Sequence, residues 1–463
     1  ERLAKGLILF LISIATICHT IILRYFLYQL DLLDTFIYRY ELREMFFTVT
    51  TANVSIVKVL MFTLILTAFV FVAWKWFMKR KYPSNLVRTA LIFSFISIPI
   101  LIIFQVLNVN LNKFSKNKSF YFYSQSVSYL FAESDVSNPY SVSDAKEFQK
   151  LNFKKSFANS EYPLLNTYQK KNVLQPYFEK FDASPTFVFL FVEGLNNDFI
   201  HPYKGGAILM PFLSNLTTRS LYWDRCFTLG ERSFGVVPSF LGSLPYGNKG
   251  FTLMENLPRH ISLVSLLHAN NYYVSFFYGQ GSWFHKKDRF FQYNNADLIF
   301  DNKKYSNRYQ KIIVGDDNFF WGYNDKDLFN QAIEVIDTLP LKPRLDIYFT
   351  GTSHSPFAIS DQEHYDRWFA QMVHDVDNVK DNKFLNHNKK YIQSLKFVDD
   401  ALSELMDRYS KRPEYKNTIF IITGDHPMTE LPRENSLKRY HVPLIIYSPS
   451  LKQSSLFHAP VSH

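Results

Sequence analysis

The long apolar runs of this chain are concentrated near its start. Residues 6–26, 54–77 and 90–111 each approach the roughly 20 mostly apolar residues that a helix needs to cross a bilayer. Beyond them the 463-residue chain is polar or alternates between short apolar and polar stretches. We therefore expect three membrane-spanning helices within residues 1–111, a polar linker with one or two helices over 112–184, and a globular domain over 185–463.

Basic residues between the second and third apolar runs predict the orientation. Lys75, Lys79, Arg80, Lys81 and Arg88 crowd this short connection, and no acidic residue lies among them. Such loops stay in the cytoplasm, so the third span would deliver the rest of the chain to the far side. Topology explains this basic cluster without a nucleic-acid partner. We expect a multi-pass protein of the plasma (inner) membrane whose globular domain is extracytoplasmic.

The ends of the chain and its cysteines restrict the class of protein. The chain begins at Glu1 rather than at a methionine, and it ends soon after an apolar strand. We therefore expect a fragment of a longer protein, with residues missing at both ends. Cys18 and Cys226 are the only cysteines, which excludes a cysteine zinc cluster or a disulfide framework.

Short apolar strands alternate with helical stretches in the globular part, and this pattern predicts the fold class. The expected strands are residues 187–192, 273–278, 346–349, 418–422 and 442–447, and helical stretches include 327–338 and 391–409. Near-continuous apolar runs indicate strands that are buried on both faces. We therefore predict an α/β domain with a mainly parallel central sheet flanked by helices.

Chemically active side chains follow several of these strands. Glu193 comes after the first, His354 follows the third, Asp425 and His426 follow the fourth, and His441 stands just before the last. Ligands in open α/β sheets bind outside the carboxyl ends of the strands, so we expect Glu193, His354, Asp425 and His426 to gather at one edge. Carboxylates with imidazole suit Zn²⁺ or Mn²⁺.

A candidate nucleophile lies in the run GERSFGVVPSFL, which predicts a turn leading into a helix. Ser233 would lie at the start of that helix. There the helix dipole and the free N–H groups favour an alkoxide and an incoming phosphoryl oxygen. The alternative is an ordinary helix cap.

The order of these motifs resembles the lipoteichoic acid synthase family, within the sulfatase and alkaline phosphatase superfamily. The motifs are Glu193-Gly-Leu-Asn, Glu-Arg-Ser233, Thr-Ser-His354-Ser-Pro-Phe, Gly-Asp425-His426 and His441-Val-Pro-Leu. The resemblance implies an alkaline-phosphatase-like domain that follows several membrane helices. It also implies one divalent metal, Mn²⁺ first with Mg²⁺ or Zn²⁺ as alternatives, held by Glu193, Ser233, Asp425 and His426. Ser233 takes the place of the usual Thr, and His354 and His441 would approach the phosphoryl or leaving group.

The substrate pocket departs from the family pattern. Trp283 supplies the expected tryptophan, but His285 replaces the arginine two positions later. The residues expected to contact substrate are Trp283, His285, Lys286, Arg232 and His354, and Lys287 or Arg289 could hold a phosphate as alternatives to Lys286. Neither Ser233 nor Cys226 begins the C/S-x-P-x-R motif that yields formylglycine, so sulfate ester hydrolysis by that route is not expected.

The expected function is that of a membrane-anchored phosphotransferase. It would move a phospholipid head group, phosphoglycerol first, through a phosphorylated Ser233 to a hydroxyl of a cell-envelope glycan or lipid. Phosphoethanolamine transfer and hydrolysis by water are alternatives with the same core chemistry. A non-catalytic lipid-binding sensor is an alternative of another class, and it would take up no stoichiometric metal.

Overall fold

The computed structural model describes residues 14–23, 25–26, 33, 35–39, scattered positions between 61 and 75, 117–131, 157–159, 162–166, and 172–463 except 231, 245–249, 255, 315–318, 432–434 and 436. Two compact units are present. One comprises residues 1–41 and 54–135, and the other comprises 42–53 and 136–463.

The first unit is described in short segments. They include the 3₁₀ helix η1 (Thr35–Arg39) and the helix α5 (Lys118–Phe131), which lies in the segment predicted as a helical linker. Tyr38 donates a hydrogen bond to Ser126 Oγ at 2.9 Å, which ties η1 to α5. The predicted span 90–111 lies outside the described residues, and 6–26 and 54–77 are described only in part. Among the residues described, no helix combines the length and apolarity needed to cross a membrane.

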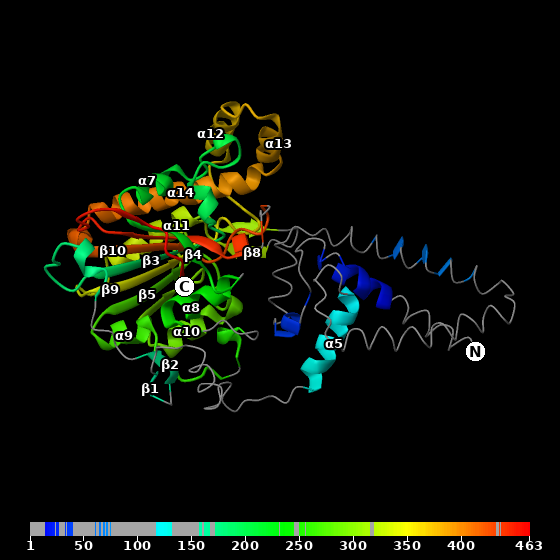
Figure 1. Cartoon of the computed structure of the whole chain (residues 1–463), viewed down its shortest axis with the longest axis horizontal. Helices are drawn as coiled ribbons and strands as arrows, with labels where there is room; N and C mark the ends of the chain where they lie inside the picture. Colours follow the sequence, from blue (N-terminus) through cyan, green and yellow to red (C-terminus); the bar gives the residue numbers. More distant parts are fainter. Residues whose placement is uncertain are drawn as a thin grey trace. The chain divides into compact units, whose positions relative to one another are not determined.

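A nine-stranded sheet forms the centre of the second unit (Figure 1). Its order is β12 (Ser455–Phe457), β4 (Leu221–Phe227), β11 (His441–Tyr447), β10 (Thr418–Gly424), β3 (Thr186–Val192), β9 (Arg344–Phe349), β5 (Tyr273–Tyr278) and β6 (Leu298–Phe300), with β13 (Val461–Ser462) also paired to β4. All neighbouring pairs are parallel except those of β11, which is antiparallel to both β10 and β4. The predicted α/β class with a mainly parallel sheet is therefore confirmed.

The expected strands correspond to β3, β5, β9, β10 and β11, and the expected helices to α11 (Asp325–Ile336) and α14 (Lys389–Ser410). Strand β4 was not predicted, because Asp224 and Arg225 interrupt its apolar pattern. Two small sheets were also not predicted. They are β1 (Phe157–Asn159) with β2 (Tyr162–Asn166), and β7 (Ile312–Val314) with β8 (Phe319–Gly322).

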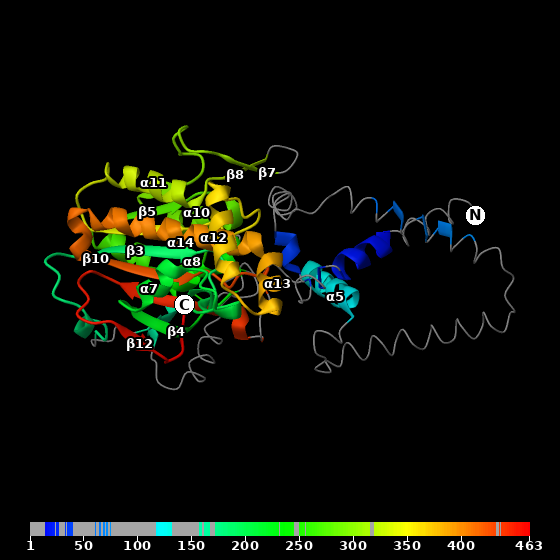
Figure 2. The same ribbon diagram turned by 90° about the horizontal axis from the view of Figure 1, so that it is seen from above.

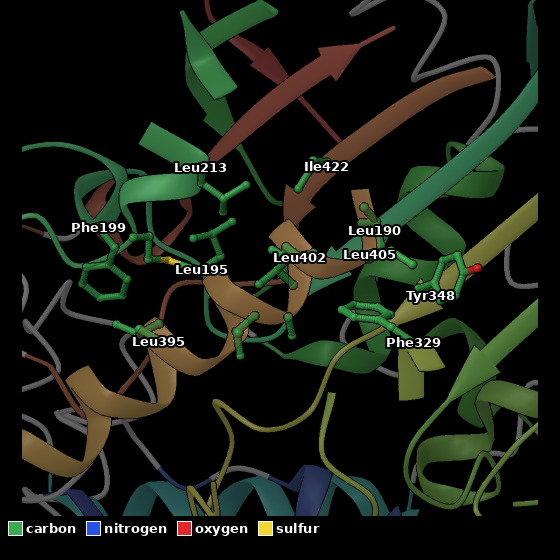
Figure 3. Close-up of a cluster of buried hydrophobic side chains, with 14 of the residues drawn as sticks. Leu190, Leu195, Phe199, Leu213, Phe329, Tyr348, Leu395, Leu402, Leu405 and Ile422 are labelled. Carbon is green, nitrogen blue, oxygen red and sulfur yellow. The ribbon is translucent and has the colours of Figure 1, made fainter. Parts of the chain in front are cut away.

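Helices cover both faces of the sheet, with α7 (Pro211–Thr217), α11 and α14 above the strands and α8 (Ser233–Gly242), α9 (Leu263–Ala269) and α10 (Lys287–Tyr293) below them in Figure 1, and Figure 2 looks down on the upper set. The upper set contributes to one apolar cluster, and the lower set contributes to the other. Strand β3 supplies both, because Leu190 belongs to the first cluster and Phe189 and Phe191 to the second. Figure 3 shows Leu190 and Ile422 of the sheet facing Leu402 and Leu405 of α14. Burial on both faces explains the continuous apolar runs of the strands.

The remaining elements are short or peripheral. Helices α12 (Gln362–His374) and α13 (Val379–His387) lie between β9 and α14 in the sequence. The 3₁₀ helices of this unit are η2 (Gln175–Tyr177), η3 (Asn197–Ile200), η4 (Lys204–Gly206), η5 (Phe251–Leu253), η6 (Phe284–Lys286), η7 (Pro413–Asn417) and η8 (Leu437–Arg439).

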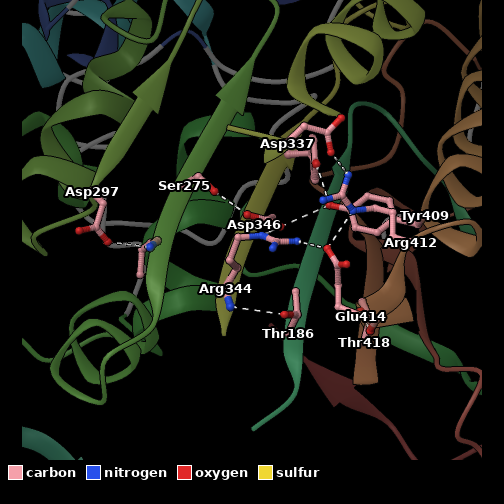
Figure 4. A network of polar contacts seen from close by, with 12 residues as sticks. Thr186, Ser275, Asp297, Asp337, Arg344, Asp346, Tyr409, Arg412, Glu414 and Thr418 are labelled. Carbon is pink, nitrogen blue, oxygen red and sulfur yellow. Dashed lines mark hydrogen bonds and ion pairs between the residues drawn. The ribbon is translucent and has the colours of Figure 1, made fainter. Parts of the chain in front are cut away.

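A buried ionic network lies at the amino end of β9 (Figure 4). Arg344 Nε lies 3.1 Å from Asp346 Oδ2, and Arg344 Nη2 lies 2.8 Å from Glu414 Oε1. Ser275 Oγ and Tyr409 OH also donate to the Asp346 carboxylate. Against the effect of burial, hydrogen bonds from Arg344 and Arg412 lower the pKa of Glu414 to about 2. The network joins β5, β9, α14 and η7 with every carboxylate paired.

We predict that Arg344→Met destabilises the protein by about 3–5 kcal/mol, because it leaves the fully buried Asp346 carboxylate without its cation. The free energy of unfolding, measured by urea denaturation, checks this. Arg367→Met is the matched control, since Arg367 pairs with Glu363 on the exposed surface of α12 and should contribute less than about 0.5 kcal/mol. Equal effects of the two substitutions would contradict the prediction.

Candidate active site

Two buried carboxylates emerge side by side at the carboxyl edge of the sheet. Strands β3 and β10 are parallel neighbours, with Val192 paired to Gly424, so the residues that follow them are adjacent. Those residues are Glu193 on one strand and Asp425 on the other. His426 completes the group, and one ligand atom from each residue lies within 4.8 Å of the others. Of the four residues expected at this edge, the structure brings Glu193, Asp425 and His426 together.

The two oxygens of Asp425 have different surroundings. Oδ1 accepts backbone hydrogen bonds from Gly194 at 2.8 Å and from His426 at 2.7 Å. Oδ2 is buried and has no hydrogen-bond partner among the described residues, although His426 Nε2 lies 3.4 Å away. A buried acceptor without a donor is costly. A cation at this oxygen would remove that cost.

The surroundings of Glu193 disfavour its charged form. Burial, and then the Asp425 carboxylate, raise the pKa of Glu193 to about 8. A divalent cation between the two carboxylates would offset both effects. Two carboxylates and an imidazole form a mixed O/N donor set that suits Mn²⁺ or Zn²⁺. The residues present therefore fit the metal that the sequence motifs imply.

Ser233 points into this group from the start of α8. Its Oγ donates to Glu193 Oε2 at 3.0 Å and lies 3.2 Å from His426 Nε2. The capping position belongs to Arg232, so Ser233 is the first helical residue rather than the cap. The free N–H groups and the dipole of this ten-residue helix favour negative charge beside the hydroxyl.

Cationic groups surround His285, whose ring contacts the residue after Ser233. His285 is buried, and its ring contacts that of Phe234, the next residue of α8, with centroids 4.8 Å apart. Burial lowers the pKa of His285 well below its usual range, and the charges of Lys287, Arg232 and His354 lower it further. These three side chains are thus close enough to make the surroundings of His285 electropositive, as an anionic substrate requires.

Of the two adjacent lysines expected as candidates for holding a phosphate, Lys287 is the buried one. Lys287 is 1% exposed, and its ammonium lies 5.0 Å from the ring centroid of Tyr278 and 5.4 Å from that of Phe349. These aromatic residues are the last residues of β5 and β9, at the carboxyl edge of the sheet. Lys286 is half-buried, and so is Trp283. The sequence does not distinguish these adjacent lysines. Their burial differs because α10 begins at Lys287 and Lys286 precedes it.

The two predicted histidines outside the cluster differ in their contacts. His354 lies in the loop after β9, with Nδ1 2.9 Å from the carbonyl oxygen of Ser355. His441 is the first residue of β11, and its Nε2 lies 2.6 Å from the Asp224 carbonyl oxygen. Asp224 lies three positions before Phe227, the backbone partner of His441. The His441 ring thus reaches back along β4, and among the described residues no hydrogen bond or ring contact joins it to Ser233.

Several residues that brace Glu193 and Asp425 were not predicted. Thr228 Oγ1 donates to the Asp425 carbonyl at 3.0 Å. Thr350 Oγ1 accepts from the backbone N–H of Glu193, and Ser353 Oγ donates to its carbonyl at 2.6 Å. The run TGTSHS after β9 contains two of these residues, so its density of hydroxyls was the available signal.

The chain is similar to known proteins over this domain. The profile of the family described as Sulfatase matches residues 185–463. The Lipoteichoic acid synthase-like YvgJ of Bacillus subtilis is 22% identical over 321 residues, which cover 64% of this chain and 48% of that protein. The Lipoteichoic acid synthase of Staphylococcus saprophyticus is 23% identical over 281 residues, which cover 59% of this chain and 38% of that protein. The chain thus spans about half the length, or less, of these curated relatives.

A solved structure shows the same fold. The crystal structure of a protein in the alkaline phosphatase superfamily from Vibrio parahaemolyticus has a TM-score of 0.50 and 22% sequence identity, and the match covers 69% of this chain and 71% of that one. This likeness supports the alkaline-phosphatase-like architecture that the sequence motifs imply.

We predict that the wild-type chain binds Mn²⁺ stoichiometrically and that Asp425→Asn weakens binding at least about 100-fold, since it removes a charge and the unpaired oxygen. Isothermal titration calorimetry measures the affinity, and the rise in melting temperature on adding metal gives an independent check. Asp198→Asn is the control, because Asp198 follows β3, as Glu193 does, but pairs with Lys438 outside the cluster. Wild-type affinity in Asp425→Asn would contradict the prediction.

Proposed function

The chain belongs to the sulfatase family, and from that premise we propose that it is a membrane-anchored, metal-dependent phosphotransferase. It moves the head group of a phospholipid to a hydroxyl of a cell-envelope glycan or lipid. Residues 185–463 form its catalytic domain, residues 1–111 its membrane domain and residues 112–184 the linker.

One observation carries the proposal. The Ser233 hydroxyl lies 3.0 Å from Glu193 Oε2 and 3.2 Å from His426 Nε2, beside a buried Asp425 oxygen that lacks a hydrogen bond. A nucleophile, a set of metal ligands and a helix amino terminus therefore converge at one point. This arrangement suits attack on a phosphorus atom, where negative charge must be stabilised on the surrounding oxygens.

Glu193, Asp425 and His426 would hold one divalent cation, Mn²⁺ by resemblance, which lowers the pKa of a nearby hydroxyl and stabilises phosphoryl charge. Ser233 Oγ forms a bond to the phosphorus of the donor lipid as its proton departs. The bond from phosphorus to the diacylglycerol oxygen breaks, and that oxygen takes up a proton. A phosphodiester on Ser233 results, and it still carries the head group.

The second step reverses the roles. An acceptor hydroxyl loses its proton and attacks the same phosphorus. The bond to Ser233 breaks, and Oγ regains a proton. Head-group transfer then leaves the enzyme unchanged.

His354 is the better candidate for the proton donor and acceptor. Its Nδ1 lies beside the Ser355 carbonyl, which can only accept, so Nδ1 carries the proton and Nε2 is the exchanging atom. In His441 the bond between Nε2 and the Asp224 carbonyl directs the ring along β4. We therefore assign proton transfer to His354 rather than His441.

Phosphoglycerol is the first choice of head group, because the chain resembles lipoteichoic acid synthases. Arg232 and Lys287 would supply positive charge for its phosphate, since both lie near His285, and Trp283 and His285 would contact the head group. Membrane anchoring suits such a substrate, since the donor lipid stays in the bilayer.

We predict that wild-type protein, incubated in detergent with Mn²⁺ and labelled phospholipids, gains a head-group adduct on Ser233. Ser233→Ala should abolish the adduct and lower diacylglycerol release on the order of 10³-fold or more, because the nucleophile is gone. Ser233→Thr should retain the adduct, since it keeps a hydroxyl. Intact and peptide mass spectrometry identify the adduct and thereby the head group.

Ser239→Ala is the matched control, because Ser239 is a buried serine of the same helix that donates to the Val236 carbonyl. An adduct of phosphoethanolamine mass would change the head group and keep the chemistry. Diacylglycerol release without an adduct would indicate hydrolysis. Folded protein that takes up neither head group nor metal would refute the transferase and favour a lipid sensor.

A further inference from the structure

The loop after β9 holds the backbone of Glu193 at both of its polar groups. Thr350 Oγ1 accepts from the Glu193 N–H at 2.9 Å, and Ser353 Oγ donates to the Glu193 carbonyl at 2.6 Å. Thr350 and Ser353 are both buried. The direction of the Glu193 side chain thus depends on the position of this loop, which also carries His354.

Asp325 fixes the middle of the same loop. Its Oδ1 accepts from the Gly351 N–H at 2.8 Å, and its Oδ2 accepts from the Thr352 N–H at 3.0 Å. The bond is reciprocated, because the Asp325 N–H donates to Thr352 Oγ1 at 2.9 Å. Three hydrogen bonds therefore join one fully buried aspartate to two consecutive loop residues.

Asp325 is not needed as a helix cap. It is the first residue of α11, but Asn324 is the capping residue, and its side chain accepts from the Asp327 N–H. Both carboxylate oxygens of Asp325 are directed at another segment of the chain, 26 and 27 residues away. A buried carboxylate costs free energy, and this one directs its hydrogen bonds to the loop. We infer that a fixed loop position is important.

Close packing leaves the loop little room to move. A Cβ atom on Gly351 would lie 2.3 Å from Gln280 Oε1, so a larger residue there would require the buried Gln280 side chain to move. The Gln280 amide donates to the Tyr323 carbonyl, two residues before Asp325. The ends of β5 and β9 and the start of α11 are thus locked together.

We propose that Asp325 is a positioning residue, which holds the loop of residues 350–354 so that Glu193 faces Asp425 in the geometry that a divalent cation requires. The inference rests on the proposed function for the presence of the metal. Asp325 itself touches neither Ser233 nor the metal ligands in the described structure. It acts through Gly351 and Thr352, and from them through Thr350 and Ser353.

The test compares Asp325→Asn with Asp399→Asn in the full chain. Asp399 is an excellent match, because it is also fully buried and accepts two consecutive backbone N–H groups, from Phe212 and Leu213. Each asparagine can accept one N–H group and turns its own amide hydrogens toward the other, so both variants should lose thermal stability. Only Asp325→Asn should weaken Mn²⁺ binding, by about 10–100-fold, as expected for a second-layer contact to a ligand.

Calorimetric titration with Mn²⁺ alone gives the decisive readout. For Asp399→Asn we expect a change within about threefold. Equal shifts in both variants, or none in Asp325→Asn, would show that Asp325 serves stability only and would overturn the proposal. Failure of the wild type to bind Mn²⁺ would overturn it too. Because no lipid or turnover is involved, a failed Ser233 adduct would refute the transferase and leave this result standing.

A milder variant covers the case in which Asp325→Asn does not fold. Ser353→Ala keeps the buried carboxylate and removes the loop's bond to the Glu193 carbonyl. It should weaken Mn²⁺ binding several-fold. Ser394→Ala is its control, since Ser394 is equally buried and donates to the Tyr391 carbonyl on α14. Identical Mn²⁺ affinities in the two serine variants would contradict the coupling between the loop and Glu193.

Discussion

The juxtaposition of Glu193 and Asp425 is the constraint on which the site depends. Parallel pairing of β3 with β10 forces the two carboxylates to leave the sheet side by side, in a place where water is excluded. Burial and mutual repulsion both raise the pKa of Glu193. Such a pair persists only where the surrounding backbone is held firmly. Thr228, Thr350 and Ser353 supply that support through their hydroxyls.

The two ends of the sheet treat buried charge in opposite ways. At the amino end, Arg344 lies between Asp346 and Glu414, and each carboxylate has a cationic partner. At the carboxyl edge, Asp425 has an oxygen without a hydrogen bond. The first arrangement stabilises the fold, whereas the second lowers its stability. The two apolar clusters, one on each face of the sheet, supply the stability that offsets the unfavourable burial of Asp425.

The sequence predicted what depends on local pattern and missed what depends on tertiary contacts. Apolar runs located the strands β3, β5, β9, β10 and β11, and the rule that ligands bind at strand ends brought Glu193, Asp425 and His426 together. The sequence could not predict that the ring of His441 turns back to Asp224, because contacts with β4 set that direction. The burial of Lys287 rather than Lys286 depends on where α10 begins. Asp325 looks like any acidic residue at a helix start, and only its bonds to the loop after β9 distinguish it.

A comparison of fully buried aspartates shows why Asp425 is the exception. Both oxygens of Asp346 accept hydrogen bonds, from Ser275 on one side and from Arg344 and Tyr409 on the other. Each oxygen of Asp325 and of Asp399 accepts one backbone N–H. Burial is unfavourable for all three of these carboxylates, and hydrogen bonds from within the protein offset that cost in each. In Asp425 one oxygen is fixed by two backbone donors, and the other faces Glu193 and His426 with no donor in the described chain. The fold thus orients this carboxylate fully and leaves one of its oxygens without a donor among the described residues, which is the arrangement that the metal ligand of the proposed function requires.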